Sequence, residues 1–222
     1  MNMQKLMSYP FAIFDLDGTL VDSMPFWRRL GRDYLLEKGI DAEPDMEQVI
    51  RAMTVSESAQ YFHDHYRLAE SPAEIIEGFG RVMEENYRLR IPAKPGVPEF
   101  LDCLYHAGID LSICSATALP QVDMILKRLG LRKYFSRITS CDEAGFGKYR
   151  PDAFLLALER AGARPEETVM YEDADYAVRT AVGTGMHVAA VYDPFCMASP
   201  EEMAAAAEFY IRDFRELIPE KL

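Results

Sequence analysis

The sequence has no uninterrupted apolar segment near the ~18 residues that a membrane-spanning helix needs, so we expect no bilayer span. Its first ten residues mix polar and apolar side chains and lack the apolar core typical of a secretory signal peptide. Neither a GxGxxG nor a GxxxxGKS/T pattern follows a strand-like run, which disfavours a generic nucleotide-binding domain.

Cysteine is scarce: the chain has four, scattered without CxxC spacing, and two of them lie in strand-like apolar runs. This usage is typical of buried, reduced thiols in a cytoplasmic protein. Net charge is −12, which argues against a nucleic-acid backbone as ligand and, more weakly, against an anionic membrane surface. In so acidic a chain, a phosphate site must be built locally from lysine, backbone N–H groups and a metal.

The segment from Phe11 to Ser23 carries the strongest functional signal. A short apolar run, typical of a buried strand, ends in Asp15 and Asp17, and Gly18 follows at once. Glycine tolerates backbone angles that other residues avoid, so the chain can turn here and bring both carboxylates to one site. One acid could attack phosphorus or bind a metal while the other handles protons. The alternative is an Asp-rich turn after a core strand.

Further polar residues stand where other parallel strands would end or a helix would begin. Because sites in open parallel sheets form beyond the carboxyl ends of the strands, we expect these side chains to converge on one crevice. Taken singly, Ser115 could be a helix cap, Lys148 a solvated surface charge and the pair Glu172-Asp173 a turn. The predicted site consists of Asp15, Asp17, Ser115, Lys148, Glu172 and Asp173.

The chain divides into two regions by pattern. Residues 22–92 show helical periodicity and no convincing strand, which predicts a helical bundle inserted after the first strand. We expect the core domain to comprise residues 1–21 and 93–222, with the proline-rich segment Ile91–Pro98 as the return hinge. The predicted helices of the insertion are Pro25–Lys38, Asp45–Met53, Ser56–Tyr66 and Pro72–Arg90.

From Val97 onward, helical and strand-like segments alternate. Strands separated by helices of 10–15 residues indicate βαβ units, so the predicted fold class is α/β, with a Rossmann-like parallel-sheet core. The predicted strands are Phe11–Asp15, Leu111–Cys114, Ile138–Cys141, Val169–Tyr171, Val188–Val191 and Phe209–Ile211.

With these motifs the chain resembles the haloacid dehalogenase superfamily, in its group of phosphate-monoester hydrolases with a helical cap. The segment Asp15–Thr19 matches motif I, Ser115 motif II, Lys148 motif III, and the pair Glu172-Asp173 motif IV. The resemblance covers about Phe11 to Ile211 and is closest to phosphoglycolate-phosphatase-like and β-phosphoglucomutase-like proteins.

The resemblance implies a Mg²⁺-dependent phosphatase that acts on a small phosphorylated metabolite. Asp15 would be the nucleophile and form an aspartyl-phosphate, and Asp17 would be the general acid and base. Lys148 would offset negative charge, and Ser115 would hold phosphoryl oxygens. The implied metal ligands are Asp15, the main-chain carbonyl of Asp17, Asp173, and Glu172 either directly or through water. We expect a monomer or a weak homodimer, with no nucleic acid or membrane as partner.

The chain departs from the family pattern at a few positions. Ala174 replaces a serine of motif IV, and we expect Asp175 to act as the helix cap instead. Trp27 stands at about the position of a histidine found in relatives that isomerise hexose phosphates. Together with Thr19, it favours water over a sugar as phosphoryl acceptor. A sugar phosphomutase and a non-catalytic phosphate-binding protein remain the alternatives.

Overall fold

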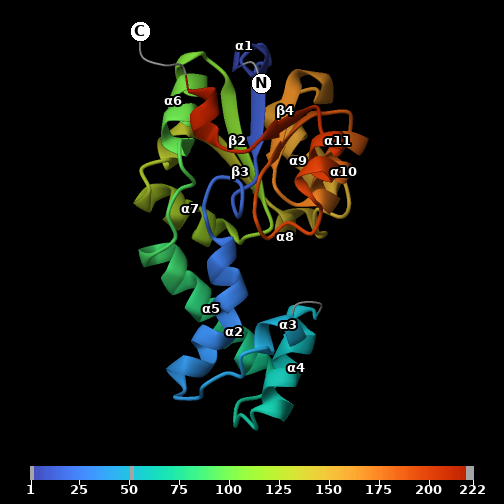
Figure 1. Ribbon diagram of the computed structural model, residues 1–222. Helices are drawn as coiled ribbons and strands as arrows, with labels where there is room; N and C mark the ends of the chain where they lie inside the picture. The colour runs from blue at the N-terminus through green and yellow to red at the C-terminus, as the bar shows by residue number, and fades with distance from the viewer. Residues whose placement is uncertain (1–2, 51–52, 219–222) are drawn as a thin grey trace. The chain divides into compact units, whose positions relative to one another are not determined.

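The computed structural model describes residues 3–50 and 53–218. The chain forms two compact units: Met1–Asp22 with Pro92–Leu222, called here the core unit, and Ser23–Ile91, called the helical unit (Figure 1). Within the described ranges, none of the helices combines the length and apolarity needed to cross a membrane.

The core unit is built on a six-stranded parallel sheet with the order β3-β2-β1-β4-β5-β6. The predicted fold class and parallel sheet are therefore confirmed. The strands of this sheet are β1 (Phe11–Phe14), β2 (Asp110–Ser115), β3 (Phe135–Ser140), β4 (Thr168–Glu172), β5 (His187–Val191) and β6 (Phe209–Ile211).

Most strand ends differ from the predicted ones by a residue or two, and the third strand differs most, at its start. It begins at Phe135, three residues before the predicted start, and Cys141 belongs to the next helix rather than to the strand. Ser140 explains this boundary, because its hydroxyl accepts a hydrogen bond from the Asp142 amide and its own amide donates one to the Glu143 carboxylate. A capping box therefore ends the strand.

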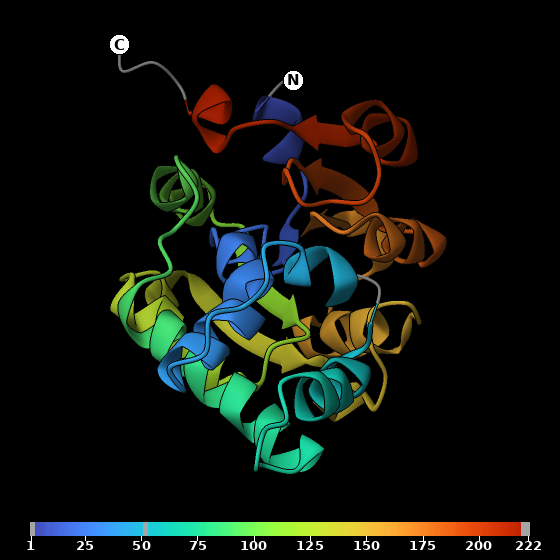
Figure 2. The ribbon, with the colours of Figure 1, turned by 60° about the horizontal axis from the view of Figure 1, so that its bottom comes forward.

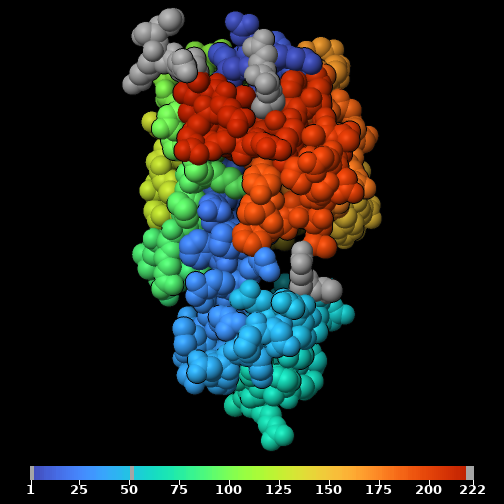
Figure 3. Space-filling model, in the orientation of Figure 1, coloured from blue at the N-terminus to red at the C-terminus, as the bar shows by residue number. Residues whose placement is uncertain are grey.

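Helices of the core unit lie on both sides of the sheet (Figures 1 and 2). In the space-filling view, the C-terminal elements, coloured red, cover part of the facing side of this unit, between green and orange segments (Figure 3). The α-helices are α1 (Met3–Leu6), α6 (Val97–His106), α7 (Leu119–Arg128), α8 (Cys141–Ala144), α9 (Asp152–Ala161), α10 (Asp175–Gly183) and α11 (Pro200–Ala206). The 3₁₀ turns are η1 (Arg132–Tyr134), η2 (Pro165–Glu167) and η3 (Phe214–Leu217).

Side chains of β1 alternate between two buried layers. Ile13 belongs to the cluster that packs under α9 and α10. Phe14 points the other way and stacks on Tyr171 of β4 at a centroid distance of 4.2 Å, and both rings meet Phe100 of α6 edge-on. Because both faces are covered, the central strands read as continuous apolar runs instead of alternating ones.

The strand order places a topological switch point at β1. The chain builds β2 and β3 on one side of β1 and then crosses to β4 on its other side. Ligand sites in open α/β sheets form beyond the carboxyl ends of the strands at such a point. The ends of β1 and β4 are therefore where the topology favours a site.

The helical unit contains four helices among its described residues, with two capping boxes. Thr54 caps α4 with Glu57, and Ser71 caps α5 with Glu74. The N-cap of α4 is therefore Thr54, two residues before the predicted start of this helix at Ser56. The helices are α2 (Met24–Glu37), α3 (Met46–Ile50), α4 (Val55–His65) and α5 (Pro72–Leu89). Part of the predicted helix Asp45–Met53, at residues 51 and 52, lies outside the described residues.

The two ends of the core unit that border the helical unit are bonded to each other. The amide of Asp22 donates to the carbonyl of Pro92 at 3.0 Å, and the amide of Lys94 donates to the carbonyl of Leu20 at 2.9 Å. The Lys94 ammonium also lies 3.0 Å from the buried carboxylate of Asp193, beyond the end of β5. These contacts hold the segment that follows Asp17 against the sheet.

We predict that Phe100→Ala lowers the free energy of unfolding by about 3–5 kcal/mol, because it removes a fully buried ring from the aromatic layer. Tyr105→Ala, on the same helix at a half-exposed position, is the matched control and should cost less than about 1 kcal/mol. Urea unfolding of both variants measures the difference. Equal losses would contradict the assigned core.

Candidate active site

The carboxyl edge of the sheet brings the predicted site residues together. Asp15 directly follows β1, and Ser115 is the last residue of β2. Glu172 ends β4, and Asp173 comes directly after it. Lys148 lies in the loop before α9. All of these side chains are buried.

Lys148 lies between two carboxylates. Its ammonium group donates to Oδ1 of Asp15 and, at 2.7 Å, to Oε2 of Glu172. Its side chain is only 4% exposed, so the alternative reading of a solvated surface charge is wrong. Although burial opposes the charged form, Asp15 and Glu172 raise the pKa of Lys148 well above its ordinary value. The lysine is therefore a fixed positive charge inside the site.

Three buried carboxylates surround one point. Asp15, Glu172 and Asp173 each offer an oxygen, and these oxygens lie within 4.8 Å of one another. Burial raises the pKa of Asp15 to about 7, against the opposing charge of Lys148. Burial, with Glu172 and Asp15 adding to it, also raises the pKa of Asp173 well above its ordinary value. The single lysine thus leaves negative charge uncompensated, and hard oxygen ligands of this kind suit a divalent cation such as Mg²⁺.

The loop after β1 approaches Asp173 closely. Gly18 has a φ of +79°, and a Cβ at this position would overlap with the Asp173 carboxylate. The hydroxyl of the next residue, Thr19, donates to Oδ1 of Asp173 at 3.1 Å and is fully buried. By its sequence pattern, Thr19 is only a marker of hydrolysis. In the structure its hydroxyl orients an acidic side chain.

Thr117 is a site residue that the sequence interpretation missed. Its hydroxyl donates to Oδ2 of Asp17 at 2.5 Å, and its amide donates to the hydroxyl of Ser115 at 3.0 Å. Thr117 lies between the end of β2 and the start of α7 at Leu119. The sequence did offer a signal for Thr117, because it carries a second hydroxyl two residues after Ser115, where the apolar strand ends.

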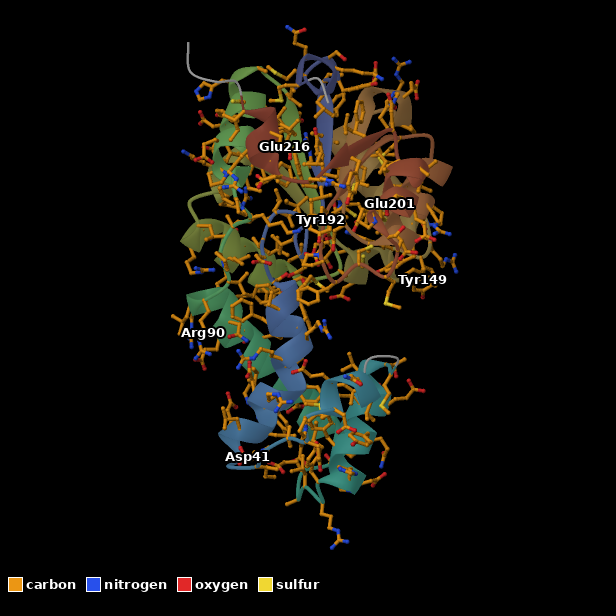
Figure 4. All side chains as sticks on the ribbon, viewed as in Figure 1. Asp41, Arg90, Tyr149, Tyr192, Glu201 and Glu216 are labelled. Atoms are coloured by element: carbon orange, nitrogen blue, oxygen red, sulfur yellow. The ribbon has the colours of Figure 1, made fainter. Side chains whose placement is uncertain are left out.

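Two nearby charged residues lie outside the cluster. We had expected Asp175 to cap α10, and this expectation is wrong. Ala174 holds the N-cap position without a side-chain hydrogen bond, and the Asp175 carboxylate lies 3.6 Å from the Arg179 guanidinium. Arg150 covers the ring of Phe146 at 3.7 Å and bonds to Asp152. Neighbouring Tyr149 points into solvent (Figure 4).

A family model described as haloacid dehalogenase-like hydrolase matches residues 12–191. The chain is similar to hexitol phosphatase A of Escherichia coli (strain K12), at 32% identity over 184 residues that cover 82% of each protein. It is also similar to a phosphorylated carbohydrates phosphatase of Thermotoga maritima, at 31% identity over 79% of this chain and 81% of the relative. CbbY from Rhodobacter sphaeroides, solved in complex with phosphate, shares the fold with a TM-score of 0.76 at 23% identity, over 94% of this chain and 96% of that one.

Substituting Gly18 tests how closely the β1 loop and Asp173 fit together. We predict that millimolar Mg²⁺ raises the melting temperature of the native chain and that Gly18→Ala removes this response, because the added methyl group displaces the Asp173 carboxylate. The matched control is Gly145→Ala, with a φ of +77° and open space around the position. Both variants should lose about 1 kcal/mol or more from backbone strain, but only Gly145→Ala should keep the Mg²⁺ response. Equal responses would contradict the assignment.

Proposed function

The chain belongs to the haloacid dehalogenase-like hydrolase family and is a phosphoric monoester hydrolase, and we propose that its substrate is a small sugar phosphate or polyol phosphate. The family expected from the sequence motifs is thereby confirmed. The named activities of the two curated relatives support the substrate class. The observation that carries the proposal is the buried Lys148, bonded to both Asp15 and Glu172 beside Asp173. Four unpaired cysteines support a place in the reducing cytoplasm.

We propose Mg²⁺ as the metal, held by carboxylates of Asp15 and Asp173 and the main-chain carbonyl of Asp17, with Glu172 binding directly or through water. The mutual approach of the three buried carboxylates and their uncompensated charge fit a hard divalent cation. When bound, the metal reduces the negative charge of the phosphoryl group and eases the approach of an anionic nucleophile.

Asp15 is the proposed nucleophile. Its carboxylate oxygen attacks phosphorus, the ester P–O bond breaks, and the leaving oxygen takes a proton from Asp17. Asp17 then accepts a proton from water as that water attacks the aspartyl-phosphate, which releases inorganic phosphate and restores Asp15. The hydrogen bond from Thr117 supports this role, because it orients the Asp17 carboxyl group.

Lys148 and Ser115 are the proposed phosphoryl-binding side chains. The charge of Lys148, already fixed by Asp15 and Glu172, offsets the charge that the phosphoryl oxygens bring into a buried site. Ser115 can donate its hydroxyl proton to a phosphoryl oxygen while its own oxygen accepts from the Thr117 amide. Preorganised donors of this kind act on charge without reorganising during the reaction.

We predict that a panel of phosphate monoesters will include a sugar or polyol phosphate that is hydrolysed with Mg²⁺ and not in excess chelator. Asp15→Asn should lower turnover more than about a hundredfold while leaving the fold intact, because it keeps the shape but loses the nucleophile. Asp142→Asn, an exposed position, is the control and should retain full turnover. Phosphate release that persists in chelator, or an Asp15→Asn variant with substantial turnover, would overturn the mechanism.

A sugar phosphomutase is the alternative within the same chemistry, and the acceptor of the phosphoryl group separates the two. Trp27 in α2 is about a third exposed. By the family resemblance it stands at about the position of a histidine in isomerising relatives, which supports water as acceptor. We predict that β-glucose 1-phosphate gives no glucose 6-phosphate in a coupled assay, while free phosphate accumulates from the preferred monoester. Efficient isomerisation with little phosphate release would reverse this choice.

A further inference from the structure

A groove runs between α2 and α5, entirely within the helical unit. Its volume is about 500 Å³, in the range of small-molecule sites. The side chains that matter for its chemistry are Phe26, Arg29 and Asp33 from α2, and Val82, Asn86 and Arg90 at α5. None of them belongs to the carboxylate cluster of the core unit.

Asn86 lines this groove and is buried in an unusual way. The residue is 2% exposed, and its side-chain amide nitrogen, Nδ2, has no hydrogen-bond partner among the described residues. Its buried neighbours on α5, Val82, Met83 and Tyr87, form an apolar surface where a polar side chain is out of place. An unpartnered buried donor destabilises the folded state, so native proteins retain few of them. A hydrogen-bond acceptor on a ligand in the groove would supply the missing partner.

Both guanidinium groups of the groove already have a carboxylate partner. The Arg29 guanidinium lies 3.2 Å from Asp33, and that of Arg90, which projects from the end of α5 (Figure 4), lies 3.0 Å from Glu85. With Glu37, three carboxylates face two guanidinium groups, in a chain of net charge −12. This balance disfavours a phosphorylated or carboxylated ligand. Paired donors and acceptors instead suit hydroxyl groups, which both donate and accept.

We propose that the groove binds a small neutral polyhydroxylated molecule, a polyol or a sugar. The Asn86 amide donates to one hydroxyl oxygen of the ligand, and the carboxylates of Asp33 and Glu85 accept from others. Phe26 and Val82 contact its C–H groups. This site goes beyond the proposed phosphatase activity and does not depend on it.

The chain offers an unusually direct probe, because Asn2 and Asn86 are its only asparagines. Labelling with ¹⁵N-asparagine therefore gives two side-chain amide signals, and Asn86→Leu identifies that of Asn86 by its loss. If that variant does not fold, Asn2→Gln makes the same assignment. Titration with mannitol should shift the Asn86 signal saturably and leave that of Asn2 in place. No shift up to the solubility of mannitol would overturn the proposal.

Two further arms test the chemistry. Asp33→Asn should weaken mannitol binding severalfold, while Asp41→Asn, an exposed position of the same unit (Figure 4), should leave it unchanged. Mannitol 1-phosphate, measured in excess chelator to prevent turnover, should bind the groove more weakly than mannitol. Equal effects of the two aspartate variants, or tighter binding of the phosphorylated compound at Asn86, would overturn the proposal.

Discussion

The interaction on which the site depends is the contact of one buried ammonium with two buried carboxylates. Lys148 reaches Asp15 from the loop before α9, and Glu172 reaches the same ammonium from the end of β4. Three segments far apart in the sequence are thereby fixed to one another at the carboxyl edge of the sheet. Removing one partner of such a pair costs about 3–5 kcal/mol, because the remaining charge stays buried without compensation. The same ammonium that holds the site together is the charge that a phosphoryl group would meet.

The surrounding groups extend this arrangement without neutralising it. Asp173 adds a third carboxylate, oriented by the Thr19 hydroxyl and by the close approach of Gly18. Thr117 orients Asp17 in turn. Asp173 and Asp17 are therefore held by neutral donors or by backbone, and the excess negative charge remains for a cation to balance. Positioning by hydroxyl groups keeps the acidic character that metal binding and proton transfer both require.

The sequence predicted the parallel sheet and the convergence of the acids, because strand ends in an open α/β sheet share one edge. It could not predict the Thr117–Asp17 contact, which depends on where β2 stops and α7 starts, a matter of two residues. Asp175 misled the cap assignment, since charge at a helix start does not decide whether the side chain caps it. The unpartnered side-chain amide of Asn86 could not be predicted either, because helical periodicity indicates a buried face but not the hydrogen bonds within it.

A double-mutant cycle between Lys148 and Asp15 tests the central claim most directly. The free energy of unfolding would be measured without metal for the native chain, Lys148→Met, Asp15→Asn and the double variant. Lys148→Met alone should destabilise strongly, and part of that loss should return when Asp15 is also neutralised, giving a coupling above about 1 kcal/mol. Losses that add to within about 0.5 kcal/mol would contradict the account, since they would mean that the two side chains do not depend on each other.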